Sequence, residues 1–242
     1  MRYGIVSDIH GNLEALESVL GELEKRQVDS ILCLGDLIGY GPNPNECVEL
    51  IKERAEVVLA GNHDYAPLDK LDLAYFNPWA RNAIEWTKER LNESSVEFLL
   101  SLPLRKKIHG VTLVHSTPLI PEEWNYIITI GDAQKNFPEF DDQVCFIGHS
   151  HVPIIIVTDS AEDCRVIQDN PLQIQDGLRY IINVGSVGQP RDLNPLAAFG
   201  VYDAAEQCYE LVRVKYDIEK TQKKIRESDL PEYLAERLEV GQ

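Results

Sequence analysis

Basic residues are scarce in this chain of 242 residues. It has 23 lysines and arginines against 40 aspartates and glutamates, which gives a formal net charge of −17 at pH 7. Proteins that bind duplex DNA or anionic membranes rely on Lys and Arg to neutralise phosphates, so we expect neither as a partner. The negative charge favours solubility, except where carboxylates lie beside histidines and could hold cations.

Long apolar runs and paired cysteines are also missing. No stretch of 18 apolar residues could span a bilayer, and the N-terminus reaches Asp8 and His10 before the apolar segment of a signal peptide could form. The five cysteines are scattered and include no C-x-x-C pair, as expected for free thiols in a reducing compartment. These absences predict a cytoplasmic protein.

Repeats, low-complexity tracts and flexible linkers are absent as well. We therefore expect one domain over residues 1–242, with a helical, cap-like insertion at about 66–109 that could serve as a lid or a specificity element. Trp79 and Trp86 are expected to be core contacts of a helix that begins at Asn77-Pro78. Ser94-Ser95-Val96-Glu97 resembles the capping box of the next helix.

The apolar pattern predicts an alternation of strands and helices in the first 60 residues. Buried strands are expected at 3–6, 30–34 and 57–60, with helices that begin after Asn12 and at Pro44. This order predicts a parallel sheet with crossover helices. The rest of the chain is richer in strands, which we expect at 104–108, 111–115, 144–147, 153–157, 164–167, 180–184, 199–202 and 209–214, before helices from Asp217 and about Pro231.

Polar residues follow many of these strands. Five of the six histidines lie at predicted strand ends, and only His109 does not. The full set at strand ends is Asp8, His10, Asp36, Asn62, His63, Asp64, His115, His149 and His151. The carboxyl ends of strands in an open α/β sheet form the crevice where ligands bind. Each motif alone fits a turn or a helix cap, but together they predict one site.

The donor atoms of this set indicate a metal centre. Nitrogen and carboxylate oxygen without thiolate suit Mn, Fe, Zn, Co or Ni, whereas Mg and Ca favour all-oxygen sets; among these we expect Mn or Fe. Seven of the residues are candidate ligands, too many for one ion, and they predict two divalent ions that share Asp36. Two ions about 3.5–4 Å apart are a common device for polarising a phosphoryl group and generating a nucleophile.

The motifs D-x-H, G-D, G-N-H-D, a later H and G-H-x-H span residues 8–151 in this order. This series resembles the calcineurin-like metallophosphoesterase superfamily. The chain also resembles its compact prokaryotic subgroup of predicted phosphoesterases, which are related to diadenosine tetraphosphatases. The resemblance implies an α/β fold of four layers, αββα, in which helices flank two mixed sheets. It further implies an enzyme that hydrolyses phosphodiesters or phosphomonoesters of small molecules or nucleotides.

The resemblance also assigns roles to residues. It implies that the first ion is held by Asp8, His10, Asp36 and His151, and the second by Asp36, Asn62, His115 and His149. His63 would contact the phosphate and protonate the leaving oxygen, so that His63 and Asp36 are the catalytic pair. Residues two apart on a strand share a face, so the assignment of His149 and His151 to different ions requires the strand to turn between them.

Two departures from the family pattern restrict the function. Protein Ser/Thr phosphatases continue the second motif as G-D-x-x-D-R-G, whereas this chain has Gly39 and Tyr40 where the acid and the arginine would stand. Protein phosphatase activity is therefore disfavoured as an alternative, whereas a dinucleoside polyphosphate hydrolase remains one. His115 stands in LVHSTP in place of the commoner G-x-H-G. A protein-binding scaffold like the retromer subunit is the non-enzymatic alternative, and the presence of His63 argues against it.

Three further residues are candidate substrate contacts. Arg191 follows a Gly-rich turn and could replace the missing arginine at the phosphate, or form a surface ion pair with Asp192 or Asp203. Tyr40 could line the substrate cleft or cover the edge of the sheet. Asn12 fits a helix cap better than a substrate contact.

Overall fold

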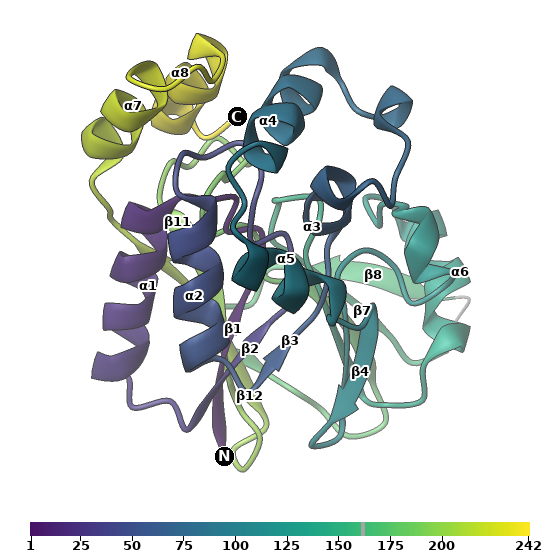
Figure 1. The fold of residues 1–242 in the computed structure, drawn as a ribbon. Helices are drawn as coiled ribbons and strands as arrows, with labels where there is room; N and C mark the ends of the chain where they lie inside the picture. The colour runs from purple at the N-terminus through teal and green to yellow at the C-terminus, as the bar shows by residue number, and fades with distance from the viewer. Residues whose placement is uncertain (161–162) are drawn as a thin grey trace.

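Two six-stranded sheets form the centre of the computed structural model, which describes residues 1–160 and 163–242. The first sheet has the strand order β3-β2-β1-β11-β12-β9 and the second β4-β5-β6-β10-β7-β8. Helices cover the outer faces of both sheets (Figure 1). Each sheet contains parallel and antiparallel pairs. The predicted fold of two mixed sheets flanked by helices is therefore confirmed.

The strands lie close to their predicted positions. The first sheet contains β1 (Arg2–Val6), β2 (Ser30–Cys33), β3 (Val57–Val58), β9 (Leu172–Gln173), β11 (Ala197–Asp203) and β12 (Cys208–Val214). The second contains β4 (Arg105–Ile108), β5 (Val111–Val114), β6 (Val144–Ile147), β7 (Ile154–Thr158), β8 (Cys164–Ile167) and β10 (Arg179–Asn183). The order β1, β2 and β3 is parallel as predicted, and β4 and β5 form the predicted hairpin.

Helices fill the outer layers and one end of the molecule. They are α1 (Leu13–Lys25), α2 (Pro44–Arg54), α3 (Asn62–Tyr65), α4 (Pro78–Lys88), α5 (Glu93–Leu100), α6 (Ile130–Asn136), α7 (Ile218–Arg226) and α8 (Glu232–Val240). All are too short or too polar to cross a bilayer, within residues 1–160 and 163–242. Sequence periodicity missed α3, α6 and β9, because elements of two to seven residues are too short to show a period.

The apolar residues form separate layers. Ile5 and Leu32 of the first sheet pack against Phe146 and Ile182 of the second. On the outer face of the first sheet, α1 and α2 bury a stripe at three-and-four spacing. Phe137 belongs to the cluster between α6 and the second sheet. The two sheets therefore form a rigid platform, and the loops at their ends are free to carry polar side chains.

Three helices gather at the end of the molecule opposite the N-terminus (Figure 1). α4, α7 and α8 share an apolar cluster that includes Ala83, Ile225 and Leu234. Tyr40, from the loop after β2, belongs to the same cluster. This helical layer therefore packs directly against the loops that follow the strands.

Two predictions for the helical insertion were wrong. α5 begins at Glu93, because Asn92 caps it by accepting a hydrogen bond of 2.8 Å from the Ser95 amide, so Ser94–Glu97 is not its capping box. Trp79 is 46% exposed and lies against Tyr233, with ring centroids 5.3 Å apart. Trp86 does pack partly buried against the α4–α7–α8 cluster. The buried face of α4 is carried by its alanines and Ile84, which leaves Trp79 at the helix margin.

Candidate metal centre

The predicted site residues converge where the strands of the two sheets end. Two groups of side chains offer ligand atoms that all lie within 4.8 Å of one another. The first is Asp8, His10, Asp36 and His151, and the second is Asp36, His115 and His149. Every member is buried. These groups coincide with the two ligand sets that the family resemblance implied, apart from Asn62, which is an amide.

The backbone turns sharply at most of these residues. Asp8, His10, Asp36, His149 and His151 all have left-handed φ values, between 50° and 67°. Such conformations are uncommon for residues other than glycine, cost on the order of 1–3 kcal/mol each and cluster at functional sites. β6 ends at Ile147, and the chain turns through His149 and His151. The strand therefore does not continue through the two histidines, and each can face a different group.

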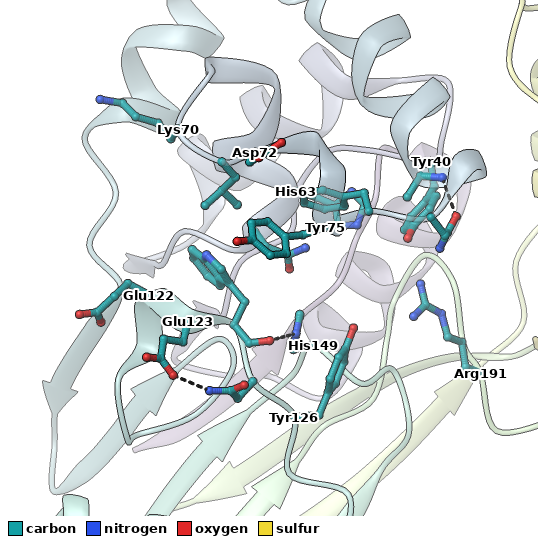
Figure 2. A pocket seen from close by; sticks show the side chains of 17 residues that line it. Tyr40, His63, Lys70, Asp72, Tyr75, Glu122, Glu123, Tyr126, His149 and Arg191 are labelled. Carbon is teal, nitrogen blue, oxygen red and sulfur yellow. Dashed lines mark hydrogen bonds between the residues drawn. The ribbon is translucent and has the colours of Figure 1, made fainter.

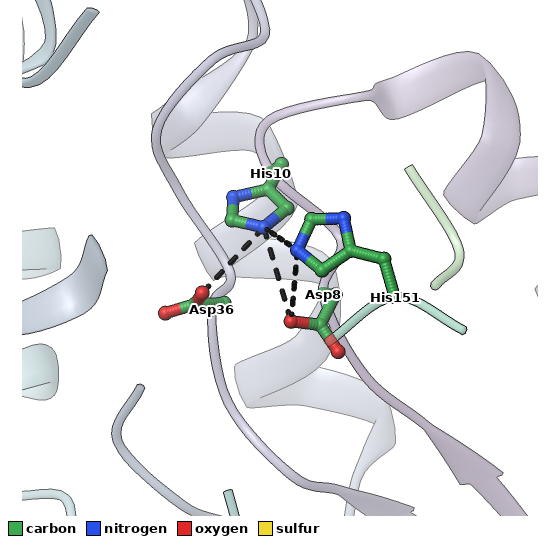
Figure 3. A group of neighbouring side chains, drawn as sticks. All are labelled: Asp8, His10, Asp36 and His151. Atoms are coloured by element: carbon green, nitrogen blue, oxygen red, sulfur yellow. Dashed lines mark hydrogen bonds and ion pairs between the residues drawn. The ribbon is translucent and has the colours of Figure 1, made fainter. Parts of the chain in front are cut away.

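The first group is arranged around the imidazoles of His10 and His151 (Figure 3). Their Nε2 atoms are 3.0 Å apart. His151 Nε2 is 3.3 Å from an oxygen of Asp8, and His10 Nε2 is 3.5 Å from an oxygen of Asp36. Both rings and both carboxylates are almost completely shielded from solvent. Two nitrogens and two carboxylates thus surround a single point.

The opposite ring nitrogens decide the protonation state of this group. His10 Nδ1 lies 3.0 Å from the Ile38 carbonyl, and His151 Nδ1 lies 2.6 Å from the Gln189 carbonyl. Because a carbonyl only accepts, each Nδ1 carries the proton, and in the neutral ring each Nε2 presents a lone pair. Two lone pairs that face each other beside two carboxylates fit a cation held between them. Such a carbonyl-anchored imidazole is the arrangement found around protein metal ions.

The second group has the same design. His115 Nδ1 lies 3.0 Å from the Leu34 carbonyl, and His149 Nε2 lies 2.8 Å from the Trp124 carbonyl. Of the other nitrogens, His149 Nδ1 is buried without a hydrogen-bond partner, as is Asn62 Oδ1, whereas His115 Nε2 faces a carboxylate oxygen of Asp36. Buried polar atoms normally have partners. These orphaned atoms therefore fit a second cation, and His115 occupies its predicted place.

The charges of the second group also favour a cation. Burial disfavours protonation of His115, but the neighbouring Asp36 outweighs it and raises the pKa of His115 to about 9. His115 Nε2 lies 3.3 Å from Asp36 Oδ2. By contrast, burial lowers the pKa of His149 to about 3, so that ring is neutral and available as a ligand at pH 7. Asp36 thus favours a positive charge next to its carboxylate. A divalent ion can supply that charge in place of the proton on His115.

Asp64 stabilises the centre although it reaches neither group, and we had not predicted a role for it. Its carboxylate accepts hydrogen bonds from the backbone amides of Asp36, Leu37 and Gly61 at 2.8–2.9 Å. A fourth amide, that of Ile38, lies at 3.3 Å. Asp64 is fully buried. It joins the loop after β2 to the start of α3 and so fixes the position of Asp36.

Asp64→Asn should lower the free energy of unfolding by about 3 kcal/mol, because the new amide group meets backbone N–H donors that the carboxylate had satisfied. Urea denaturation measures this loss. Asp217→Asn is the matched control, because Asp217 caps α7 with its side chain and asparagine caps helices equally well. Equal stability of Asp64→Asn and the wild type would contradict the role of Asp64.

His63 lies beside the ligand groups and packs on Gly39. Its ring centroid is 4.9 Å from that of His10 and 4.4 Å from that of Tyr40. A Cβ atom at Gly39 would lie 2.6 Å from His63 Nδ1, and Gly39 has a φ of 87°. Burial lowers the pKa of His63 to about 4, so the ring is neutral at pH 7. Glycine at position 39, where protein Ser/Thr phosphatases have an acidic residue, thus leaves room for the imidazole.

Because the family resemblance assigns His63 to catalysis, Gly39→Ala should displace His63 and lower kcat by about 10²-fold, which is what a small misplacement of a catalytic group can cost. The positive φ adds strain on the order of 1–3 kcal/mol. Steady-state kinetics with a chromogenic phosphoester measure the effect. Gly21→Ala is the control. Gly21 lies inside α1, and a Cβ atom there would meet no neighbouring atom within 4 Å outside the helix's own backbone. This variant should have normal turnover and a free energy of unfolding about 0.5–1 kcal/mol higher than that of the wild type. Normal turnover in Gly39→Ala would contradict this packing.

A cavity of about 610 Å³ opens beside the second group (Figure 2). His63, His149 and Asn62 line its inner part, together with Tyr40 and Arg191. The guanidinium of Arg191 lies 5.6 Å from the centre of the Tyr40 ring and donates a 2.8 Å hydrogen bond to Gln189. Asp192 pairs with Arg213, so Arg191 is not engaged in the predicted surface pair with that residue.

Asn12 is a helix cap in the structure. Its Oδ1 accepts a 3.1 Å hydrogen bond from the Ala15 amide, and its Nδ2 donates a 2.8 Å hydrogen bond to the Gly188 carbonyl. It is buried and does not line the 610 Å³ cavity. The structure therefore gives no support to Asn12 as a substrate contact, because its amide is already used in joining α1 to the loop at Gly188.

The sequence did not indicate that residues 122–126 line this cavity. Trp124 supplies the carbonyl that anchors His149, and Tyr126 stacks on the His149 ring with centroids 4.1 Å apart. Ile120 and Trp124 both have left-handed φ values. The segment has no hydrophobic periodicity. Its only sequence feature that could have indicated a binding role is the run Trp124-Asn125-Tyr126, two aromatic residues around an amide.

Comparison with known proteins decides the family. The model of the calcineurin-like phosphoesterase superfamily domain matches residues 1–207. The chain belongs to this superfamily. Its relatives include a metallophosphoesterase from Sphaerobacter thermophilus, whose crystal structure is 44% identical, covers 100% of this chain and 99% of that chain, and has a TM-score of 0.89. The predicted resemblance to metallophosphoesterases is confirmed.

Two further relatives of this calcineurin-like phosphoesterase differ in coverage. An uncharacterized protein of Methanocaldococcus jannaschii is 41% identical over 247 residues, which is 98% of this chain and 97% of that protein. Serine/threonine-protein phosphatase 1 of Salmonella typhimurium is 31% identical over 121 residues, which is 48% of this chain and 56% of that protein. Membership in a metal-dependent family agrees with the two buried ligand groups.

Proposed function

We propose that this phosphoesterase uses two metal ions to hydrolyse phosphodiester or phosphomonoester bonds of small-molecule or nucleotide substrates. The observation that carries the proposal is the position of Asp36. One of its oxygens lies 3.5 Å from His10 in the first group and 3.3 Å from His115 in the second. A carboxylate placed in this way can bridge two ions.

The residues divide into two ligand sets. Asp8, His10, Asp36 and His151 would hold the first ion, and Asp36, Asn62, His115 and His149 the second. Imidazole and carboxylate donors without thiolate favour Mn or Fe, and Zn, Co or Ni also suit them. When bound, two such ions neutralise charge on the phosphoryl oxygens and supply a strong nucleophile at neutral pH. They also reverse the local sign of this acidic protein.

The remaining residues handle the substrate. His63 lines the cavity next to Asn62 and is placed to contact a phosphoryl oxygen. The negative charge of a bound phosphate would favour the protonated ring, which could then give a proton to the leaving oxygen. Arg191 and Tyr40 line the same cavity as His63, and their side chains could also bind phosphoryl oxygens of the substrate. Asp64 and the four backbone carbonyls hold the ligands in position.

The direct test is hydrolysis of bis-(p-nitrophenyl) phosphate and p-nitrophenyl phosphate by protein loaded with Mn. We expect turnover that EDTA abolishes and that added Mn restores. Bound metal without hydrolysis of any phosphoester would favour the alternative of a protein-binding scaffold. The presence of His63 next to both ligand groups argues for the enzyme.

Protein phosphatase activity is a weaker alternative. Part of the chain is similar to a bacterial Ser/Thr phosphatase. However, this chain has Gly39 and Tyr40 where the Ser/Thr phosphatase motif has an acidic residue and an arginine. We place the protein in the cytoplasm, because Cys33, Cys47 and Cys145 are buried as free thiols, a state that a reducing compartment preserves.

A further inference from the structure

The 610 Å³ cavity has two chemically different ends (Figure 2). Arg191, Tyr40 and His63 lie at the end next to the ligand groups. The other end is lined by four exposed charged side chains, Lys70, Asp72, Glu122 and Glu123. With three carboxylates against one ammonium, this outer end repels anions. The inner end becomes attractive to a phosphate once cations occupy the ligand groups.

Aromatic rings connect the two ends. Phe76 packs edge-on against His63 with centroids 5.3 Å apart, and Tyr126 stacks on His149. In Figure 2, Tyr75 lies beside His63, on the side of the cavity toward Glu122 and Glu123. It is 89% exposed, and its ring contacts no other ring in residues 1–160 and 163–242. Tyr75 therefore offers a free aromatic face to a molecule that enters the cavity.

From this layout we propose that the cavity selects esters of a single phosphate whose alcohol carries an uncharged aromatic ring system of nucleoside size. The proposal rests on the proposed phosphoesterase function and specifies its substrate class. A volume of 610 Å³ is far larger than one phosphate needs and lies in the usual range for an organic ligand. Stacking of one base on an aromatic side chain contributes about 1–3 kcal/mol.

The charges disfavour a substrate with a longer phosphate chain. With its reacting phosphate at the ligand groups, a dinucleoside polyphosphate would place its remaining phosphates toward Asp72, Glu122 and Glu123. Each pair of like charges about 4 Å apart costs about 1 kcal/mol even in water, and Lys70 alone cannot offset three carboxylates. The same carboxylates can accept hydrogen bonds from the amino groups of a base. The alternative of a dinucleoside polyphosphate hydrolase is therefore disfavoured.

Substrate pairs that share a reacting group but differ in the ring isolate this effect. Suitable pairs for the Mn-loaded protein are adenosine 5′-phosphate with ribose 5-phosphate, and adenosine 2′,3′-cyclic phosphate with glycerol 1,2-cyclic phosphate. In whichever pair is hydrolysed, we expect kcat/KM to favour the adenosine member by about tenfold or more. Tyr75→Ala should reduce that ratio toward one, mainly through KM. Tyr233→Ala, which removes an aromatic residue of α8 outside the cavity, should keep the wild-type ratio.

The charge argument has its own test. Exchanging both Glu122 and Glu123 for Gln should raise kcat/KM for diadenosine tetraphosphate several-fold relative to the preferred adenosine ester. The matched control exchanges both Glu236 and Glu239 of α8 for Gln and should leave this ratio unchanged. A wild type that shows no preference for adenosine, or that prefers diadenosine tetraphosphate, overturns the inference. If no substrate is hydrolysed, including bis-(p-nitrophenyl) phosphate, the proposed function itself fails.

Discussion

Asp36→Asn should abolish metal binding at both ligand groups and reduce phosphoester hydrolysis by about 10³-fold or more, since bound ions contribute several kcal/mol to the transition state. Asp36 Oδ2 lies between His10 and His115, and Oδ1 accepts a 2.8 Å hydrogen bond from the His63 amide. An asparagine would direct an NH₂ group at one of these positions. Elemental analysis of the Mn-loaded variant should show far fewer than two ions per chain.

A loss of folding could mimic this result, so the variant needs a structural control. Asp203→Asn is matched in chemistry, because the Asp203 side chain accepts hydrogen bonds from two backbone amides that asparagine can also serve. It should retain full metal content and activity. Circular dichroism of Asp36→Asn should match the wild type. A folded Asp36→Asn protein with two ions and normal turnover would contradict a shared ligand.

Unlike Asp36→Asn, His63→Ala should keep its metal content while its turnover falls by about 10²–10⁴-fold, the usual contribution of a general acid. No atom of His63 belongs to either ligand group, yet the ring lies 4.9 Å from that of His10 and lines the cavity. The loss should be larger for an alkyl ester than for a nitrophenyl ester, because nitrophenolate leaves without a proton. Steady-state kinetics on both esters measure this difference.

His109→Ala is the control for this variant. His109 is the histidine outside the strand-end set, and it stacks on Tyr3 with centroids 5.2 Å apart, at the opposite end of β5 from His115. Its replacement should leave kcat unchanged on both esters. An equal loss on alkyl and nitrophenyl esters in His63→Ala would argue that His63 positions the phosphate and does not donate a proton.

The sequence was sufficient to predict the centre because its residues follow strands. Apolar runs locate strand ends, and parallel strands bring those ends to one edge, so Asp8, Asp36 and His149 could be placed together although 141 residues separate the first from the last. His115 could be included for the same reason, even though its surrounding motif departs from the common form. The turn between His149 and His151 followed only from the family resemblance.

The cavity could not be predicted in the same way. Residues 120–126 form a loop with left-handed residues and a single 3₁₀ turn, Pro121–Glu123, and such a segment carries no hydrophobic period. Asp64 was visible in the G-N-H-D motif, but its role depends on backbone amides from a loop 26 to 28 residues earlier in the chain. The prediction that Trp79 is buried was wrong, because helix periodicity alone did not show which face of α4 the helices α7 and α8 would cover.

Metal content tests both the number of bound ions and whether the two ions have separate ligands. Mn-loaded wild-type protein should contain two ions per chain. His149→Ala should lose mainly one ion and His151→Ala mainly the other, so each variant should retain about one, and the double variant should retain almost none. One ion per chain in the wild type, lost equally in both single variants, would show a single shared site and contradict the dinuclear centre.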